Sequence, residues 1–167
     1  STDRTVEIAS SVRGVKLYRL REQFGRGSAL RLGVEKARGD LIVFFPADME
    51  YEPSGICAVV HNLLNNGFNA VFGTRLARCS DLTYRLRQIY GGATNSYLLS
   101  KYGGMLLSTA ILFLYSRHVS DPLTGLKGFN GELLRSLPLR ATGIDLEMEL
   151  VAQLCLRHEQ ILEIPIH

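Results

Sequence analysis

The chain has 167 residues, of which 46% are hydrophobic and 21% are charged, and its formal net charge at pH 7 is +3. This length suits one domain with a buried core, and the composition argues against a disordered chain or a repeat array. The Lys and Arg residues form no dense block, so we expect no nucleic-acid partner, whereas the mild positive charge permits an anionic ligand or a membrane surface.

The apolar pattern alternates between helical and extended periods along the chain. It predicts helices over residues 5–12, 28–37, 53–66 and 143–158, helical segments over about 83–116, strands over 15–20, 40–45, 69–74 and 160–166, and a loop that runs into a strand over 120–130. Alternation of strands with helices predicts an α/β domain with a mostly parallel sheet flanked by helices. We expect the first three predicted strands to adjoin one another.

An acidic cluster follows the predicted strand over 40–45, in the stretch FFPADMEYEP at residues 44–53. Ligands bind at the carboxyl ends of the strands in such sheets, and Asp48 and Glu50 come just after one of these ends. Their spacing allows two oxygens to converge on one hard cation, and Mg²⁺ or Mn²⁺ held by carboxylates and substrate phosphates is usual in phosphate chemistry. The alternative is a solvated acidic loop, and the spacing alone does not decide.

Other polar residues also follow predicted elements. Arg75 comes after the strand over 69–74, and an arginine fork suits bidentate phosphate recognition, which we favour over the alternative of a surface arginine. Arg85 and Arg87 open the next helical segment and suit either a phosphate or a basic polar face. Asp121 fits a turn aspartate before proline, and Lys127 on the following strand faces either phosphates or water.

The apolar stretch YGGMLLSTAILFLY, residues 102–115, raises the question of a membrane. It is shorter than the roughly 20 residues that a spanning helix needs. Lys101 and Arg117 flank it, as suits a helix lying at a membrane interface, and the alternative is a core helix packed on the sheet. We expect a peripheral protein.

Five stretches in this order together resemble glycosyltransferase family 2: STDRTVEIA, RGSALRLGVEKARGDLIVFFPADMEYEP, VFGTRL, SDPLTGLKGF and GIDLEMELVAQL. The resemblance is greatest to polyprenyl-phosphate sugar synthases of the dolichyl-phosphate mannose synthase type. It implies a GT-A fold (nucleotide-diphospho-sugar transferase, Rossmann-like), a nucleotide-sugar donor, a divalent cation, Mg²⁺ or Mn²⁺, and a polyprenyl-phosphate acceptor. It also implies a cytoplasmic protein, peripheral at the cytoplasmic face of a membrane.

The resemblance assigns roles to single residues. It implies catalytic roles for Asp121 and Arg75, binding of donor or acceptor phosphates by Arg75, Arg85, Arg87 and Lys127, and metal binding by Asp48 and Glu50. The family usually has Asp-Ala-Asp where this chain has Pro46-Ala47-Asp48, so the first carboxylate is missing and cation binding is weakened. In the family STD ends an acidic loop after the second strand, so we expect residues 1–167 to form a single incomplete GT-A domain that lacks the first strand.

A lipid-phosphate acceptor fits the lack of a clear general base. A phosphate monoester with a second pKa near ~6 is already anionic at neutral pH, so catalysis must mainly stabilise the leaving diphosphate. We therefore expect inverting, cation-assisted transfer of a sugar to a polyprenyl phosphate, dolichyl or undecaprenyl. The alternatives are a family 2 transferase that acts on a polysaccharide or another hydroxyl acceptor, and a catalytically inactive GT-A-like module.

Overall fold

The computed structural model describes residues 4–20, 24–49, 51–74 and 94–166. Within them a four-stranded sheet runs in the order β1-β3-β2-β4, built from β1 (Leu41–Phe44), β2 (Ala70–Thr74), β3 (Lys127–Asn130) and β4 (Ile161–Pro165). β2 pairs in parallel with β4, whereas β3 lies antiparallel between β1 and β2. Three of the four strands therefore run in the same direction, as the predicted α/β class requires, and β3 makes the sheet mixed.

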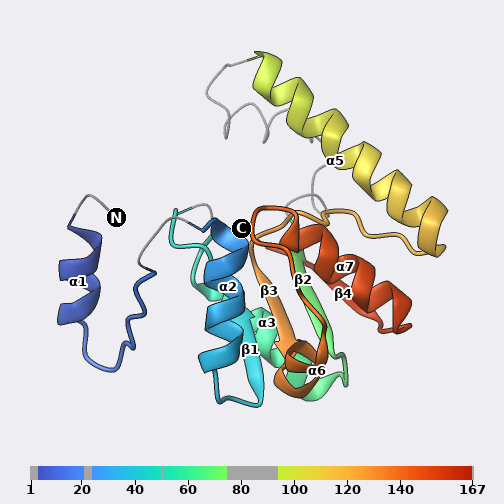
Figure 1. Cartoon of the computed structure of the whole chain (residues 1–167). Coiled ribbons are helices and arrows are strands. Elements are labelled where there is room, and N and C mark those ends of the chain that lie inside the picture. The colour runs from blue at the N-terminus through green and yellow to red at the C-terminus, as the bar shows by residue number, and fades with distance from the viewer. Residues whose placement is uncertain (1–3, 21–23, 50, 75–93, 167) are drawn as a thin grey trace.

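Helices cover both faces of this sheet (Figure 1). The helices in the described part of the chain are α1 (Thr5–Ser11), α2 (Arg26–Lys36), α3 (Ser54–Asn65), α5 (Thr94–Tyr115), α6 (Gly131–Ser136) and α7 (Leu146–Leu156), and α1 stands apart from the sheet. The predicted helices over 5–12, 28–37, 53–66 and 143–158 are confirmed. The short α6 is an addition, and the Asn130 side chain caps it by accepting hydrogen bonds from the backbone N–H groups of Glu132 and Leu133.

The sheet separates two hydrophobic clusters. On one face Phe44, Phe72 and Phe129 pack with the inner sides of α2, α6 and α7. On the other face Val71 packs with Val59 of α3 and its neighbours. Because both faces are covered, every residue of β2 is buried, which explains its continuous apolar sequence.

The predicted strand over 15–20 is wrong. In the described part of the chain these residues belong to neither a helix nor a strand, and each of them is exposed. A strand needs a partner for its backbone hydrogen bonds, and the sheet offers this segment none, although its alternating pattern is typical of a strand. The strands over 40–45 and 69–74 form, but they do not adjoin each other because β3 lies between them.

Helix α5 has one side against the body of the protein and one side exposed. Ile111 is buried in the core and Ser108 donates a hydrogen bond to the Ser120 carbonyl oxygen. Over residues 103–115 of α5, whose side chains the structure describes, the exposed large apolar residues are Met105, Leu106, Leu112, Phe113 and Leu114. No helix in the described part of the chain has the length and hydropathy that crossing a membrane requires.

Candidate functional site

The predicted site residues that the structure describes come together at one end of the sheet. β1 and β2 end there, with Asp48 in the loop that follows β1. β3 runs the other way, so its first residue, Lys127, pairs with Phe44 and Phe72 at this same end. The loop that carries Asp121 leads into β3. Opposite strand directions thus place the loop after β1, the end of β2 and the loop before β3 at one end of the sheet, where ligands bind in open sheets.

The loop after β1 has an exposed tip and a buried anchor. Asp48 is exposed, and the adjacent Met49 is 96% exposed with a left-handed φ of 64°. Tyr51 is buried, and its Oη accepts a hydrogen bond of 2.8 Å from the Gly125 backbone N–H. The same Oη lies 3.3 Å from the Thr124 hydroxyl oxygen. The acidic tip is therefore fixed to the loop that precedes β3.

The start of α2 carries an arginine toward this end of the sheet. Gly25 has a φ of 85°, and both Gly25 and Gly27 pack on the backbone at Thr142 so closely that a Cβ would clash. Arg26 lies between these glycines, and its side chain is 44% exposed. Its Nη2 atom is 3.3 Å from Oε1 of Glu147. The close backbone packing therefore fixes the position from which the guanidinium extends.

Arg26 and the loop after β1 meet at Gly125. A Cβ at Gly125 would overlap Pro46 and would lie 3.1 Å from the Arg26 Nη2 atom. Pro46 precedes Asp48 by two residues. The half-exposed guanidinium is therefore a neighbour of the acidic loop, separated from it by a glycine that has no room for a side chain.

A buried ion pair lies beneath these loops. Lys127 and Glu147 are 0% and 2% exposed, and their charged groups are in direct contact. The Lys127 Nζ also donates a hydrogen bond of 2.5 Å to the Thr124 carbonyl oxygen. Burial lowers the pKa of Lys127 below its usual value, while the charges of Glu147 and Asp121 oppose that shift and Arg26 adds to it. Such a pair needs both partners, because either charge alone would be buried without compensation.

The loop that carries Asp121 is held from β4. The Glu163 carboxylate accepts hydrogen bonds from the backbone N–H groups of Ser120 and Asp121 at 2.9–3.1 Å, and from the Ser120 hydroxyl. The Asp121 carbonyl oxygen accepts from the Thr124 backbone N–H at 3.2 Å, which closes a turn. Asp121 is 5% exposed. It is a turn aspartate, as the simpler interpretation expects, and it is also buried at the predicted site.

The predicted site residues divide by position. The structure brings Asp48, Asp121 and Lys127 to one end of the sheet, whereas Glu50, Arg75, Arg85 and Arg87 lie outside the described residues. Lys127 is in the interior with its charge matched by Glu147. This position favours a supporting role beneath the site, and direct phosphate binding by Lys127 stays a prediction.

The carboxylates present fit a cation only in part. Over the residues that the structure describes, no group of three or more His, Cys, Asp or Glu side chains is arranged to hold a metal ion. Pro46 offers no ligand, so Asp48 supplies one carboxylate at the surface. A hard cation held by one or two carboxylates and substrate phosphates needs no larger set of protein ligands. Asp48 and Glu50 with a bound diphosphate would satisfy that requirement.

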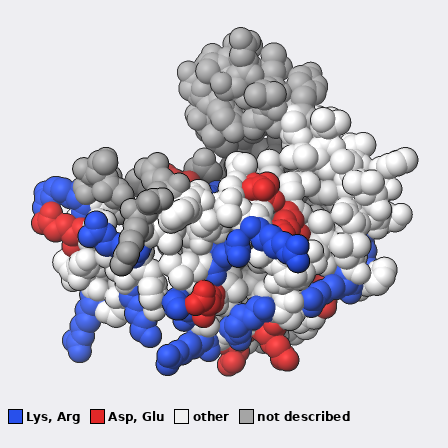
Figure 2. Space-filling view, in the orientation of Figure 1, with Lys and Arg blue, Asp and Glu red and all other residues white. Residues whose placement is uncertain are grey.

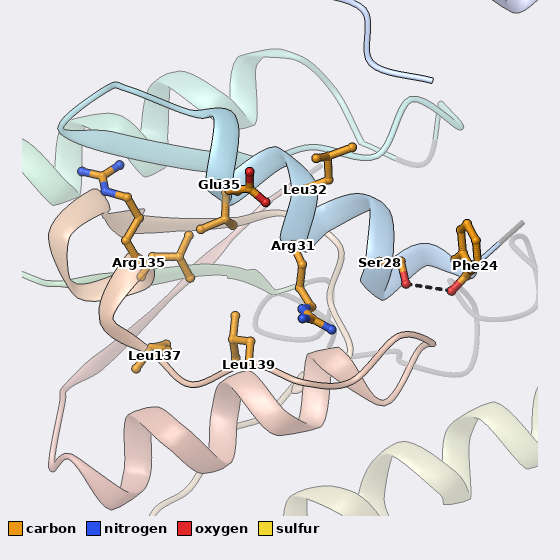
Figure 3. A pocket seen from close by; sticks show the side chains of 10 residues that line it. Phe24, Ser28, Arg31, Leu32, Glu35, Arg135, Leu137 and Leu139 are labelled. Atoms are coloured by element: carbon orange, nitrogen blue, oxygen red, sulfur yellow. Dashed lines mark hydrogen bonds between the residues drawn. The ribbon is translucent and has the colours of Figure 1, made fainter. Parts of the chain in front are cut away.

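A separate groove of about 640 Å³ lies along α2 and α6 (Figure 3). Its lining residues are Phe24, Ser28, Arg31, Leu32, Val34, Glu35, Leu134, Arg135, Leu137 and Leu139. Arg31 donates a hydrogen bond of 2.8 Å to the Arg140 carbonyl oxygen, and Arg135 donates to the carbonyl oxygens of Ala37 and Gly39. These arginines hold loops together, and the lining includes none of the predicted site residues.

Comparison with known proteins gives consistent matches. A profile described as "Glycosyl transferase family 2" matches residues 1–124. The chain is 26% identical to a dolichol-phosphate mannosyltransferase from Pyrococcus furiosus, over 99% of this chain and 44% of that protein. It is 28% identical to a dolichyl-phosphate hexose transferase from Haloferax volcanii, over 99% of this chain and 65% of that protein. The chain thus spans less than half of the first relative and about two thirds of the second.

A solved structure matches the fold. The crystal structure of glucosyl-3-phosphoglycerate synthase from Mycobacterium tuberculosis superimposes with a TM-score of 0.63 at 25% identity, over 99% of this chain and 56% of that chain. The same enzyme has also been solved in complex with Mn²⁺, uridine diphosphate and phosphoglyceric acid.

Proposed function

The chain belongs to glycosyl transferase family 2 and has a GT-A-like α/β fold, and from this we propose that residues 1–167 form one incomplete GT-A domain of a polyprenyl-phosphate sugar transferase. The donor is a nucleotide sugar. The acceptor is a polyprenyl phosphate, and the observation that carries this choice is that the two relatives described above are named for dolichol or dolichyl phosphate.

The chemistry of this acceptor suits the side chains at the site. An anionic phosphate oxygen attacks the anomeric carbon, the bond from that carbon to the donor diphosphate breaks, and the nucleoside diphosphate leaves with inversion at the carbon. The nucleophile is already deprotonated at neutral pH, so no general base is required. Arg75, Arg85 and Arg87 bind donor or acceptor phosphates, and Asp121 lies beside the reacting sugar.

A divalent cation, Mg²⁺ or Mn²⁺, belongs to this proposal. Asp48 and Glu50 would hold it together with the donor diphosphate, and its charge would stabilise the leaving group. The exposure of Asp48 supports this assignment, because a carboxylate at the surface of the site can meet an arriving ligand. Of the other carboxylates nearby, Glu147 contacts the Lys127 ammonium and Glu163 accepts hydrogen bonds from backbone N–H groups.

The exposed apolar face of α5 supports a membrane surface as a partner at the cytoplasmic side. Phe113 is 87% exposed, and uncharged side chains cover the surface at the end of α5 that follows residue 102 (Figure 2). An apolar helix face of this kind inserts into the headgroup region of a bilayer. Replacing Phe113 by Ser in the full-length protein should weaken co-sedimentation with anionic phospholipid vesicles, and equal binding would remove α5 from the membrane contact.

The test of the proposed function is an acceptor comparison in the full-length protein. Transfer from a nucleotide sugar with Mn²⁺ is measured to a short polyprenyl phosphate and to the matching polyprenol. We expect product with the phosphate alone, at a rate that rises as the second phosphate proton leaves around pH ~6 to 7. Transfer to the alcohol or to a sugar hydroxyl instead would favour a hydroxyl acceptor. The absence of both transfer and Mn²⁺-dependent donor hydrolysis would favour an inactive module.

A further inference from the structure

Glu147 of α7 lies beneath the candidate site with its two oxygens toward different cations. Oε2 contacts the Lys127 ammonium. Oε1 is buried and, among the described residues, has no hydrogen-bond partner; the Arg26 Nη2 atom is 3.3 Å away. A buried carboxylate in this position needs positive charge on both sides, because the interior cannot solvate it.

The contact with Arg26 leaves most of the guanidinium available. An arginine side chain has five N–H donors in a fixed plane, and Glu147 faces one of its terminal nitrogens. The side chain is 44% exposed and lies next to Gly125 and Pro46, at the base of the loop that carries Asp48. The remaining donors therefore border the place where the proposed anionic donor would bind.

Glu147 is also connected to the acidic loop through a second route. Lys127 donates to the Thr124 carbonyl oxygen, Thr124 contacts Tyr51, and Tyr51 anchors the loop with Asp48. The Thr124 hydroxyl additionally donates to the Gly73 carbonyl oxygen at the end of β2. One carboxylate thus supports the loop that carries Asp48, the loop that precedes β3 and the end of β2.

We propose that Glu147 is a positioning residue, which holds the Arg26 guanidinium at the edge of the donor site and, through Lys127, the turn against which the Asp48 loop rests. This inference depends on the proposed function, since it assumes a nucleotide-sugar donor at that edge. Glu147 does not touch the donor. Its effect on binding is transmitted by Arg26, which distinguishes it from a residue that only stabilises the fold.

The test is a double-mutant cycle on nucleotide binding in the full-length protein. Calorimetry with Mn²⁺ and either uridine diphosphate or guanosine diphosphate is applied to Glu147→Gln, Arg26→Gln and the double variant. Each single change should weaken binding about tenfold, and the double variant should stay within about twofold of the weaker single, because the two residues act as one unit. Additive losses, or wild-type affinity in Glu147→Gln, would overturn the proposal.

Two further variants separate positioning from stability. Replacing the pair together, Lys127→Met with Glu147→Leu, should restore thermal stability relative to Glu147→Gln, since buried pairs often tolerate apolar replacement. Nucleotide binding should still be about tenfold weaker, because Arg26 has lost its carboxylate. Recovery of both properties would show a purely structural role. Glu149→Gln on the same helix is the matched control and should bind nucleotide as the wild type does.

A readout without ligand distinguishes failure of this inference from failure of the proposed function. If the wild-type protein binds neither nucleotide with Mn²⁺, the proposed donor site is wrong. The ¹⁵N heteronuclear NOE of the Arg26 Nε–H group then still tests the positioning. It should be high in the wild type and should fall in Glu147→Gln, and an equal value in both proteins would overturn the role of Glu147.

Discussion

Asp48 and Glu147 lie at the same end of the sheet in opposite surroundings. Asp48 is exposed at the tip of a loop, whereas Glu147 is 2% exposed and faces two protein cations. This difference in burial suggests different roles for the two carboxylates, ligand binding for one and support of the loops for the other. Under the proposed function, the carboxylate at the surface meets the ligand, and the buried one supports the loops beneath without touching the ligand.

The largest effect should come from removing the buried carboxylate. Glu147→Ala leaves the Lys127 ammonium buried without its partner, which should lower the free energy of unfolding by about 3–5 kcal/mol. Urea denaturation measures this loss. Glu149 on the same helix accepts hydrogen bonds from the Arg140 and Ala141 backbone N–H groups, so Glu149→Ala should cost only about 1–3 kcal/mol. Equal losses would contradict the special cost of leaving the buried Lys127 charge unpaired.

The second effect concerns Gly125, where the loop that carries Asp48 meets the Arg26 side chain. Gly125→Ala adds a methyl group that overlaps Pro46 and approaches Arg26, so the acidic loop or the guanidinium must move. Overpacking of this kind costs about 1–3 kcal/mol of unfolding free energy. Gly67→Ala is the control for a loss of glycine without a clash, since its Cβ would meet open space, although its φ of 69° adds strain. Gly125→Ala should weaken the binding of nucleotide with Mn²⁺, and Gly67→Ala should not, if the packing of Gly125 on Pro46 and Arg26 shapes the site. The reverse result would contradict this role of Gly125.

The third effect should fall on the cation and spare the fold. Asp48→Asn removes a charged ligand and should weaken Mn²⁺ binding in the presence of a nucleoside diphosphate by about tenfold. Electron paramagnetic resonance of Mn²⁺ measures the affinity. Glu52→Gln is the matched control, since Glu52 is exposed on the same loop and accepts a hydrogen bond from the Ser54 hydroxyl. Similar affinities in all three proteins would mean that the loop is merely solvated.

The smallest effect is a pH dependence from Lys127. Burial lowers the pKa of this ammonium in the folded chain below the unfolded value of 10.5. Between the folded and the unfolded pKa, Lys127 is protonated more fully in the unfolded chain than in the folded chain. The free energy of unfolding therefore rises with pH across that window. The groups that face it are Glu147, Asp121 and Arg26. The wild type should therefore gain stability relative to Lys127→Met as the pH is raised toward 10.5, and a constant difference would contradict the shift.

Much of the fold could be predicted because its elements carry strong local patterns. The helices that form α2, α3 and α7 and the strands that form β1 and β2 follow from apolar spacing alone. The segment over 15–20 has an equally good pattern and forms no strand, because pairing depends on a neighbour that a local pattern cannot reveal. The capped start of α6 had a signal in Asn130, which side-chain capping makes recognisable.

The candidate site could be predicted only for its exposed part. Asp48 follows a strand end, which is a local signal, whereas the contacts of Glu147 with Lys127 and Arg26 join distant parts of the chain. Helical spacing predicts that Glu147 and Glu149 do not share a face, and the structure agrees, but spacing does not say which faces inward. A glutamate within the apolar strand β4, Glu163, was a further signal of a polar contact in the interior of the site, and its carboxylate is part-buried.

The most direct test compares Mn²⁺-dependent sugar transfer to a polyprenyl phosphate, per folded molecule, in full-length Asp48→Asn and Glu147→Gln proteins, together with their melting temperatures. Asp48→Asn should lose transfer by about a hundredfold with an unchanged melting temperature. Glu147→Gln should lower the melting temperature and weaken donor binding. Two results would contradict the account: transfer that Asp48→Asn retains, or transfer that is lost only together with the folded state. Either result would mean that the exposed carboxylate does not bind the ligand.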